Sequence, residues 1–222
     1  MPSARIADAR GRLLEAAIDV FGRHGYAGAT TRAIAKQAGL NLQAIAYHFG
    51  GKEGLYLAAA DHLADRMRAL LEPMAARARA RFADPDAPPV TADEARAMLT
   101  GMFGSVAGIL FDDAWTPVAR FMVREQMDPT EAFDHIYERL VEPTLATARH
   151  VVAVLVGAPA DSQRVRLRTL SLIGSIMFFR IAHGAATRQL GWTRTGPREL
   201  AAIRELVEDT IASVGRVPKR SS

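Results

Sequence analysis

The sequence predicts an all-α protein with an N-terminal three-helix helix-turn-helix head and a larger helical body. Three observations lead to this fold class. Apolar residues recur at helical spacing along most of the 222 residues, no stretch alternates as a β-strand does, and Gly39-Leu40-Asn41 separates two short amphipathic segments. We expect about nine helices, with residues 1–52 forming the head and residues 53–222 the body.

Composition limits the class of protein. Hydrophobic residues make up 49% of the chain and charged residues 23%, which is typical of an ordered globular protein. The chain has no cysteine, so disulfides and thiolate metal sites are excluded. The longest apolar run, residues 170–179, ends at Arg180 and is too short to span a bilayer. We therefore expect a cytoplasmic protein with no membrane partner.

The head begins with a helix that ends near His24, before Gly25. Its buried side is predicted from helical spacing and consists of Leu13, Leu14, Ala17, Ile18 and Phe21. Thr30 or Thr31 is expected to cap the second helix, and Asn41 the third. Gly39 supplies the positive φ that a tight turn between crossing helices needs, with Ile34 and Ile45 packing inside. An ordinary αα-hairpin with a glycine cap is the alternative interpretation.

Charge favours a nucleic-acid partner for the head. Residues 1–52 carry seven basic and three acidic residues, whereas the 21 basic and 21 acidic residues of the remainder cancel. The excess positive charge therefore lies on the segment with the helix-turn-helix pattern, as phosphate contacts require. We expect the following residues to contact double-stranded DNA: Thr31, Arg32, Asn41, Leu42, Gln43, Ala44, Tyr47, His48 and Lys52.

Different contacts are expected within this set. Gln43 stands near the start of the recognition helix and pairs naturally with adenine N6 and N7, with Arg32 and Asn41 as further candidates for base contact. Asn41 has the alternative role of a helix cap only. Tyr47, His48 and Lys52 are expected to hold the phosphate backbone beside the groove.

The run Ala44-Ile45-Ala46-Tyr47-His48-Phe49-Gly50-Gly51-Lys52-Glu53-Gly54-Leu55 resembles the end of the recognition helix in the TetR family of bacterial transcriptional regulators. Upstream, residues 16–21, Gly25-Tyr26 and Thr30-Thr31 resemble that family's first helix and the entry to its second. The resemblance covers roughly residues 10–57. Ala46 departs from it, because many relatives carry an aromatic residue there. Residues 115–192 also resemble the C-terminal domain of the CecR-type branch.

The body is predicted to consist of successive helices. One runs from Lys52 to about Phe82 with Pro73 as a kink or break, and a Pro-rich linker follows at residues 84–89. Thr91 and Glu94 form a capping box for the next helix. Further helices are expected at about 116–127, at 131–156 with a bend at Pro143, at 161–190 and at 197–214.

The resemblance implies that the body encloses a cavity for a mostly apolar small-molecule effector. Methionine and aromatic residues at helical spacing are also consistent with plain core. The candidate ligand-binding residues are Met67, Met102, Phe103, Arg120, Phe121, Met122, Tyr137, Met177 and Arg180. Arg180 interrupts an apolar run. It either pairs with a carboxylate such as Glu125 or Glu138, reaches solvent at a helix end, or selects an effector that bears a negative or acceptor group.

The last two helices are the expected dimer surface. The final helix shows an a/d-like spacing, and small residues of the preceding helix would permit close approach. The expected interface consists of Ile176, Gly184, Leu200, Ile203, Val207, Ile211 and Val214. The alternative is that these helices only close the core of one protomer.

The sequence therefore predicts a homodimeric, ligand-responsive DNA-binding regulator, a repressor in preference to an activator, that binds a palindromic operator. No catalytic residue, cofactor or metal site is assigned, because no phosphate-binding glycine loop, HExxH motif or nucleophile elbow occurs. The alternatives are an all-helical enzyme acting on an apolar small molecule, and a nucleoid protein that binds DNA without sequence preference.

Overall fold

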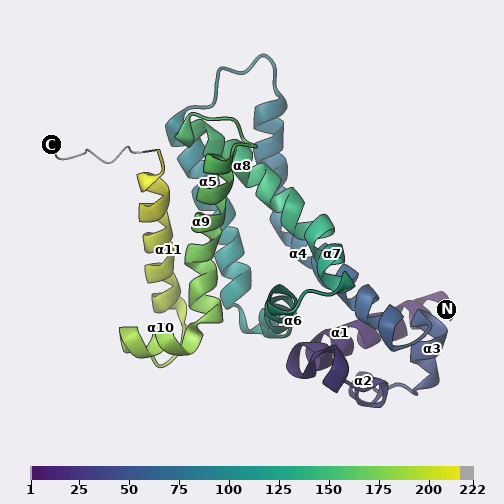
Figure 1. The fold of residues 1–222 in the computed structure, drawn as a ribbon. Helices are drawn as coiled ribbons and strands as arrows, with labels where there is room; N and C mark the ends of the chain where they lie inside the picture. The colour runs from purple at the N-terminus through teal and green to yellow at the C-terminus, as the bar shows by residue number, and fades with distance from the viewer. Residues whose placement is uncertain (1, 216–222) are drawn as a thin grey trace. The chain divides into compact units, whose positions relative to one another are not determined.

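Every regular element of the described chain is a helix, which confirms the all-α class (Figure 1). The computed structural model describes residues 2–215, with side chains described for residues 8–215. These residues form two compact units. The first contains residues 2–69 and 113–142, and the second contains residues 70–112 and 143–215. Helix α4 (Lys52–Ala83) contributes residues to both units.

The first unit contains the helix-turn-helix and a later helical segment. Helices α1 (Pro2–Gly28), α2 (Thr31–Ala38) and α3 (Gln43–Phe49) are followed by the start of α4. The short 3₁₀ turn η1 (Asp113–Trp115) leads into α6 (Thr116–Met127) and α7 (Glu131–Ile136). Helix α1 packs against both α2 and α6. The fully buried side chains of this unit include Leu13, Leu14, Ile18, Phe21, Ile34, Ile45, Leu55, Leu63, Phe121 and Ile136.

Helices α1 and α6 approach closely because a glycine lies at their contact. A Cβ added at Gly22 would lie 2.9 Å from the Pro117 carbonyl oxygen, so only glycine fits there. Gly25 then adopts φ 70° and ψ 174°, which ends the regular helical geometry of α1. The Arg124 guanidinium donates a hydrogen bond of 3.3 Å to the Arg23 carbonyl. Helix α6 is thus fixed to the C-terminal end of α1.

Glu125 is a buried carboxylate that joins three helices of the first unit. Its residue is 1% exposed. One oxygen accepts a hydrogen bond from the Tyr56 hydroxyl of α4, and the other accepts from the Thr130 backbone N–H at 3.2 Å and the Thr130 hydroxyl at 2.8 Å. Thr130 is in turn the N-cap of α7. Burial, followed by the bond to Glu125, raises the pKa of the Tyr56 phenol above its usual range.

The second unit packs helices around a single apolar core. It contains the end of α4 and helices α5 (Ala92–Phe111), α8 (Glu142–Val156), α9 (Gln163–Ile181), α10 (His183–Leu190) and α11 (Pro197–Ser213). Helices α5, α9 and α11 contact one another and run side by side in Figure 1. The predicted capping box at the start of α5 is present, since Glu94 N–H donates to the Thr91 hydroxyl and Thr91 N–H donates to the Glu94 carboxylate.

Pro73 does not break α4, and Pro143 follows a π-helical turn. Helix α4 continues through Pro73, whose missing N–H leaves only the Ala69 carbonyl, the last residue of the first unit, without its helical donor. Before Pro143 the helix widens into the π-helical turn η2 (Tyr137–Val141), where Glu142 N–H reaches the Tyr137 carbonyl five residues back. This single turn divides the expected helix over 131–156 into α7 and α8.

The expected helix over 161–190 is also divided. Helix α9 ends before Ala182, which leaves the helical region with φ −94° and ψ 33°, and α10 departs at 82°. The weak helix former Gly184 follows two residues later. Within the described residues no single helix meets the length and hydropathy required to cross a membrane, although the bent pair α9 and α10 meets them when taken together.

Removing the Tyr56 hydroxyl is expected to destabilise the fold. Tyr56→Phe leaves one oxygen of the buried Glu125 carboxylate without its donor, which should lower the free energy of unfolding by about 1–3 kcal/mol. Because the pKa of Tyr56 is raised, this difference should be full below the ordinary pKa of tyrosine, should shrink as the pH rises above that value, and should vanish above the raised pKa. Denaturant unfolding followed by circular dichroism measures the difference. Tyr47→Phe is the matched control, since Tyr47 is 77% exposed and should be neutral.

Candidate nucleic-acid interface and apolar cavity

The turn between α2 and α3 is held by local backbone and side-chain bonds. The Thr30 hydroxyl accepts from the Ala33 N–H at 3.1 Å, which assigns the cap of α2 to Thr30 and not to Thr31. Gly39 adopts φ 65° and ψ 35°, as the turn requires, and the Leu40 N–H returns to the Ala35 carbonyl at 2.9 Å. The Asn41 Oδ1 accepts from the Ala44 N–H at 3.0 Å, so Asn41 caps the start of α3.

A buried carboxylate fixes α2 on α1. Asp19 is 9% exposed, and its two oxygens accept from the Arg23 guanidinium at 2.8 Å and from the Gln37 amide at 2.9 Å. Ile34 of α2 and Ile45 of α3 are almost fully buried beneath the turn. The recognition helix therefore has one orientation relative to α1, set by a polar tie on one side and apolar packing on the other.

The structure brings the predicted DNA-contact residues onto the surface of α2, α3 and the start of α4. Arg32, Asn41, Leu42, Gln43 and Tyr47 are exposed. Thr31, Ala44, His48 and Lys52 are partly buried. The exposed set follows the start of α3 and then its outward side, which is the arrangement that places a helix in the major groove.

Two cations of this surface lie over aromatic rings. The Lys52 ammonium is 4.5 Å from the centre of the Tyr26 ring, and the Arg10 guanidinium is 5.4 Å from the centre of the Phe49 ring. Contact with an aromatic face limits the motion of a long cationic side chain and leaves its charge uncompensated. The two cations lie at opposite ends of the α3–α4 connection, and the phosphate contact expected of Lys52 stays a prediction.

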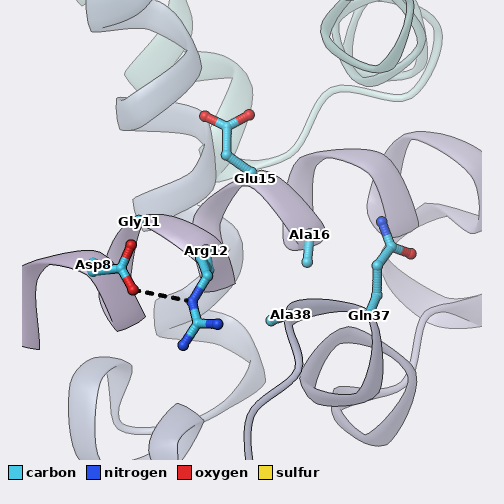
Figure 2. Close-up of a pocket in the computed structure, with 7 residues that line it drawn as sticks. All are labelled: Asp8, Gly11, Arg12, Glu15, Ala16, Gln37 and Ala38. Carbon is cyan, nitrogen blue, oxygen red and sulfur yellow. Dashed lines mark ion pairs between the residues drawn. The ribbon is translucent and has the colours of Figure 1, made fainter. Parts of the chain in front are cut away.

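An open groove of about 490 Å³ lies between α1 and α2 (Figure 2). Its lining includes the ion pair between Arg12 and Asp8, 3.3 Å apart, and the carboxylate of Glu15. None of the predicted DNA-contact residues lines it. Both acidic side chains of the lining already have cationic partners, Asp8 in Arg12 and Glu15 in the Arg66 guanidinium at 2.6 and 2.7 Å.

A small enclosed cavity of about 30 Å³ lies inside the second unit, between α4, α5, α8 and α9. Its lining is almost wholly apolar. The lining residues are Leu71, Met74, Ala75, Met102, Phe103, Val106, Thr144, Ala148 and Ile173. Met102 and Phe103 were predicted from the sequence. The other lining residues were missed, because apolar periodicity identifies the inward side of a helix without telling which inward residues border a void.

The remaining predicted ligand residues do not line this cavity. Phe121 packs against Phe21 and Tyr56 in the aromatic cluster of the first unit, so its structural role is established. Arg120 is exposed, Tyr137 donates to Glu142, and Met177 packs against the core of the second unit. Glu125, considered as a partner of Arg180, instead uses its oxygens for Tyr56 and Thr130. The roles of Met67, Met122 and Arg180 in ligand binding stay predictions.

The expected dimer interface needs correction. Ile176, Ile203, Val207, Ile211 and Val214 are at most 4% exposed within a single chain, so they have no surface left for a second copy. Leu200 packs against the same core. Only Gly184 of the expected set is exposed. The a/d-like spacing of the last helix therefore describes the core of one protomer, the alternative that the spacing left open.

A helix-turn-helix with an exposed second helix, followed by a larger helical unit, defines the class of the protein as a DNA-binding transcriptional regulator. The N-terminal model of the bacterial regulatory proteins of the tetR family matches residues 13–59. The model of the C-terminal domain of the HTH-type transcriptional dual regulator CecR matches residues 95–216. The chain belongs to the TetR family and carries a CecR-type C-terminal domain.

Individual relatives agree with this assignment. The chain is 34% identical over 201 residues to the dual regulator CecR of Shigella flexneri, covering 90% of this chain and 87% of the relative. The repressor AcnR of Corynebacterium glutamicum is 45% identical over 60 residues, 27% of this chain and 32% of the relative. The fold is similar to that of Bacillus subtilis FadR in complex with stearoyl-CoA, with a TM-score of 0.64 at 19% identity, covering 93% of this chain and 98% of the other.

Removing the Lys52 charge is expected to weaken DNA binding without changing its sequence preference. Lys52→Ala should lower affinity for every sequence alike and reduce the slope of log affinity against log salt by about one. Fluorescence anisotropy titrations at several salt concentrations measure both quantities. Arg168→Ala removes the same charge from an exposed position in the second unit and should leave both unchanged. A loss at one sequence only, with a constant salt slope, would contradict a phosphate contact.

Gln43 is expected to recognise a base. Gln43→Ala should cost about 1–3 kcal/mol at the preferred sequence and relax the preference at one base pair of each half-site. Selection of bound sequences from a random DNA pool, performed with both proteins, measures the preference at every position. An unchanged profile would remove Gln43 from the base-contacting set.

Proposed function

We propose that the protein is a homodimeric repressor that binds a palindromic DNA operator and leaves it when a mostly apolar small molecule binds the helical body. The observation that carries the DNA-binding part is the exposed edge of α3. Leu42, Gln43 and Tyr47 point outward there, while Ile34 and Ile45 are buried beneath them. Large apolar and aromatic side chains are left exposed on a short helix when a partner covers them.

The proposed function requires that the protein bind its operator in preference to other DNA sequences. The full chain should bind a selected operator at least about 10³-fold more tightly than unrelated DNA at the same salt concentration. A ratio near one would favour the alternative of a nucleoid protein without sequence preference. The named relatives are transcriptional regulators. The alternative of an enzyme would be supported only if the protein converted the effector into a product.

One of the two named relatives favours repression over activation. AcnR, similar over the DNA-binding head, is named a repressor, whereas CecR, similar over most of the chain, is named a dual regulator. Effector release requires only that the ligand bind the non-DNA-binding conformation more tightly, by a coupling free energy of about 1–3 kcal/mol. The cavity between α4, α5, α8 and α9 supports an apolar effector, because its walls offer almost no polar group.

For the proposed dimer, an exposed apolar stripe on the outer side of α9 is the surface that the exposed residues support. Leu167, Leu170, Phe178 and Ile181 are 53–59% exposed and recur at a spacing that places them on one stripe of the helix. Gly174 lies in the same stripe, and a Cβ added there would meet no atom within 4 Å. Such a stripe, about 21 Å long, allows the same helix of a second copy to approach closely. A dimer also supplies the two recognition helices that a palindrome requires.

A charge in this stripe is expected to separate the protomers. Phe178→Glu should shift the protein to a monomer, because dimerisation would bury an unpaired carboxylate, and operator affinity should fall although no DNA contact is altered. Analytical ultracentrifugation and operator titration measure the two effects. Met127→Glu is the matched control, since Met127 is 79% exposed in the first unit. A dimer that survives Phe178→Glu at micromolar concentration would place the interface elsewhere.

A further inference from the structure

We infer that the cavity of the second unit binds an unbranched, uncharged hydrocarbon chain, and that Met74 and Gly101 together set the longest chain it accepts. The inference rests on the proposed function, since it names the chemical class of the effector and the residues that select it. The inference does not depend on the DNA sequence of the operator or on how the protomers associate.

The walls of the cavity determine the chemistry of its ligand. Among the described residues that line it, none carries a charge, and Thr144 alone has a polar side chain. A charged or strongly polar group placed there would lose its hydration without gaining hydrogen bonds. Each methylene group transferred from water into such a site raises the affinity roughly four-fold. A hydrocarbon segment is therefore the part of an effector that this cavity stabilises.

The cavity must expand to accept a chain, and methionines make this possible. Its present volume of about 30 Å³ holds little more than one small group. Met74 and Met102 reach it from α4 and α5. Methionine has three rotatable bonds and no branch, so it can change conformation at small cost and leave a narrow space in its place. A slender chain fits such a space, whereas a rigid ring system would require the helices to separate.

Gly101 provides the place that the Met74 side chain occupies. A Cβ added at Gly101 would lie 2.5 Å from the Met74 Cε, which shows that the terminal methyl group rests where the glycine has no side chain. An alanine at this position would force the methyl group away from α5. Since Met74 borders the cavity, the displaced group would take up space that a ligand needs. The pair therefore determines how much of the cavity is free.

A matched pair of substitutions on α5 isolates this effect. Gly101→Ala introduces a methyl group against Met74, whereas Gly108→Ala introduces the same group on the same helix where no atom lies within 4 Å. Both changes raise helix propensity equally. Met74→Ala removes the side chain altogether, and Met74→Leu serves in its place should the truncated variant lose its cooperative melting transition.

The test uses the full chain without DNA and the straight-chain primary alcohols from 1-butanol to 1-dodecanol as probes. Isothermal titration calorimetry gives the affinity for each probe. In the wild type, affinity should rise with each methylene and then stop rising at a limiting length. Gly101→Ala should shorten that length by roughly two methylenes, a loss of about fifteen-fold in affinity for the longest probe that the wild type binds. Gly108→Ala should match the wild type, and Met74→Ala should lengthen the limit.

Three results would overturn the inference. Gly101→Ala could bind the series as Gly108→Ala does, Met74→Ala could keep the wild-type limit, or neither the wild type nor Met74→Ala could bind any probe. Operator release is measured separately, by adding the longest bound alcohol to the protein–operator complex. Chain-length selection without release would leave the cavity assignment standing and refute the proposed regulation. Release without chain-length selection would refute the cavity assignment and leave the proposed regulation standing.

Discussion

The buried carboxylate of Glu125 is the interaction on which the first unit depends. A carboxylate that is 1% exposed is stable only when donors surround it, and here the donors come from α4 through Tyr56 and from the N-terminus of α7 through Thr130. Each of these helices is thereby tied to α6. Since α6 also meets α1 at Gly22, the helix that supports the recognition helix is fixed by residues about one hundred positions later in the chain. The DNA-binding surface is therefore more than a local helix-turn-helix, because its foundation includes residues 113–142.

A second buried carboxylate, Asp19, joins α1 to α2 of the helix-turn-helix. Asp19 holds α2 through Gln37, and the apolar contacts of Ile34 and Ile45 hold α3 against it. Tyr26, at the C-terminal end of α1, receives the Lys52 ammonium on its ring, while Tyr56 packs 5.0 Å from Tyr26 and binds Glu125. A proposed phosphate-contacting cation and the buried carboxylate of the same unit are thus connected through two tyrosine rings. Such packed side chains have few alternative arrangements, so they keep the interface preorganised and reduce the entropy lost on binding.

Local patterns predicted local structure well, because the forces involved act within a few residues. The positive φ of Gly39, the cap at Asn41 and the capping box of Thr91 and Glu94 each follow from residue type and spacing alone. Five of the seven residues expected in the dimer seam are covered within one protomer, because an a/d spacing identifies an apolar side of α11 without telling which protomer covers it. The same limit applies to Phe121 and Glu125, whose partners are distant in the sequence. Gly22 and Gly25 stand close to Phe21 in the sequence, which is a signal for a close helix contact. This signal does not show which helix makes the contact. The DNA-contact residues stay predictions, now placed on one exposed surface.

Helix α4 gives the proposed regulation a physical route that requires no additional contact. It carries Tyr56, which binds Glu125 in the first unit, and Met74, which borders the cavity in the second. Between them, Pro73 leaves the Ala69 carbonyl without its helical donor, next to the point in the sequence where the two units divide. A ligand that displaces Met74 acts on a residue adjacent to this point. The differential affinity needed for release, about 1–3 kcal/mol, corresponds to only a few buried methylene groups. The proposed regulation therefore needs an effector chain only a few methylene groups longer than one that leaves the operator occupied.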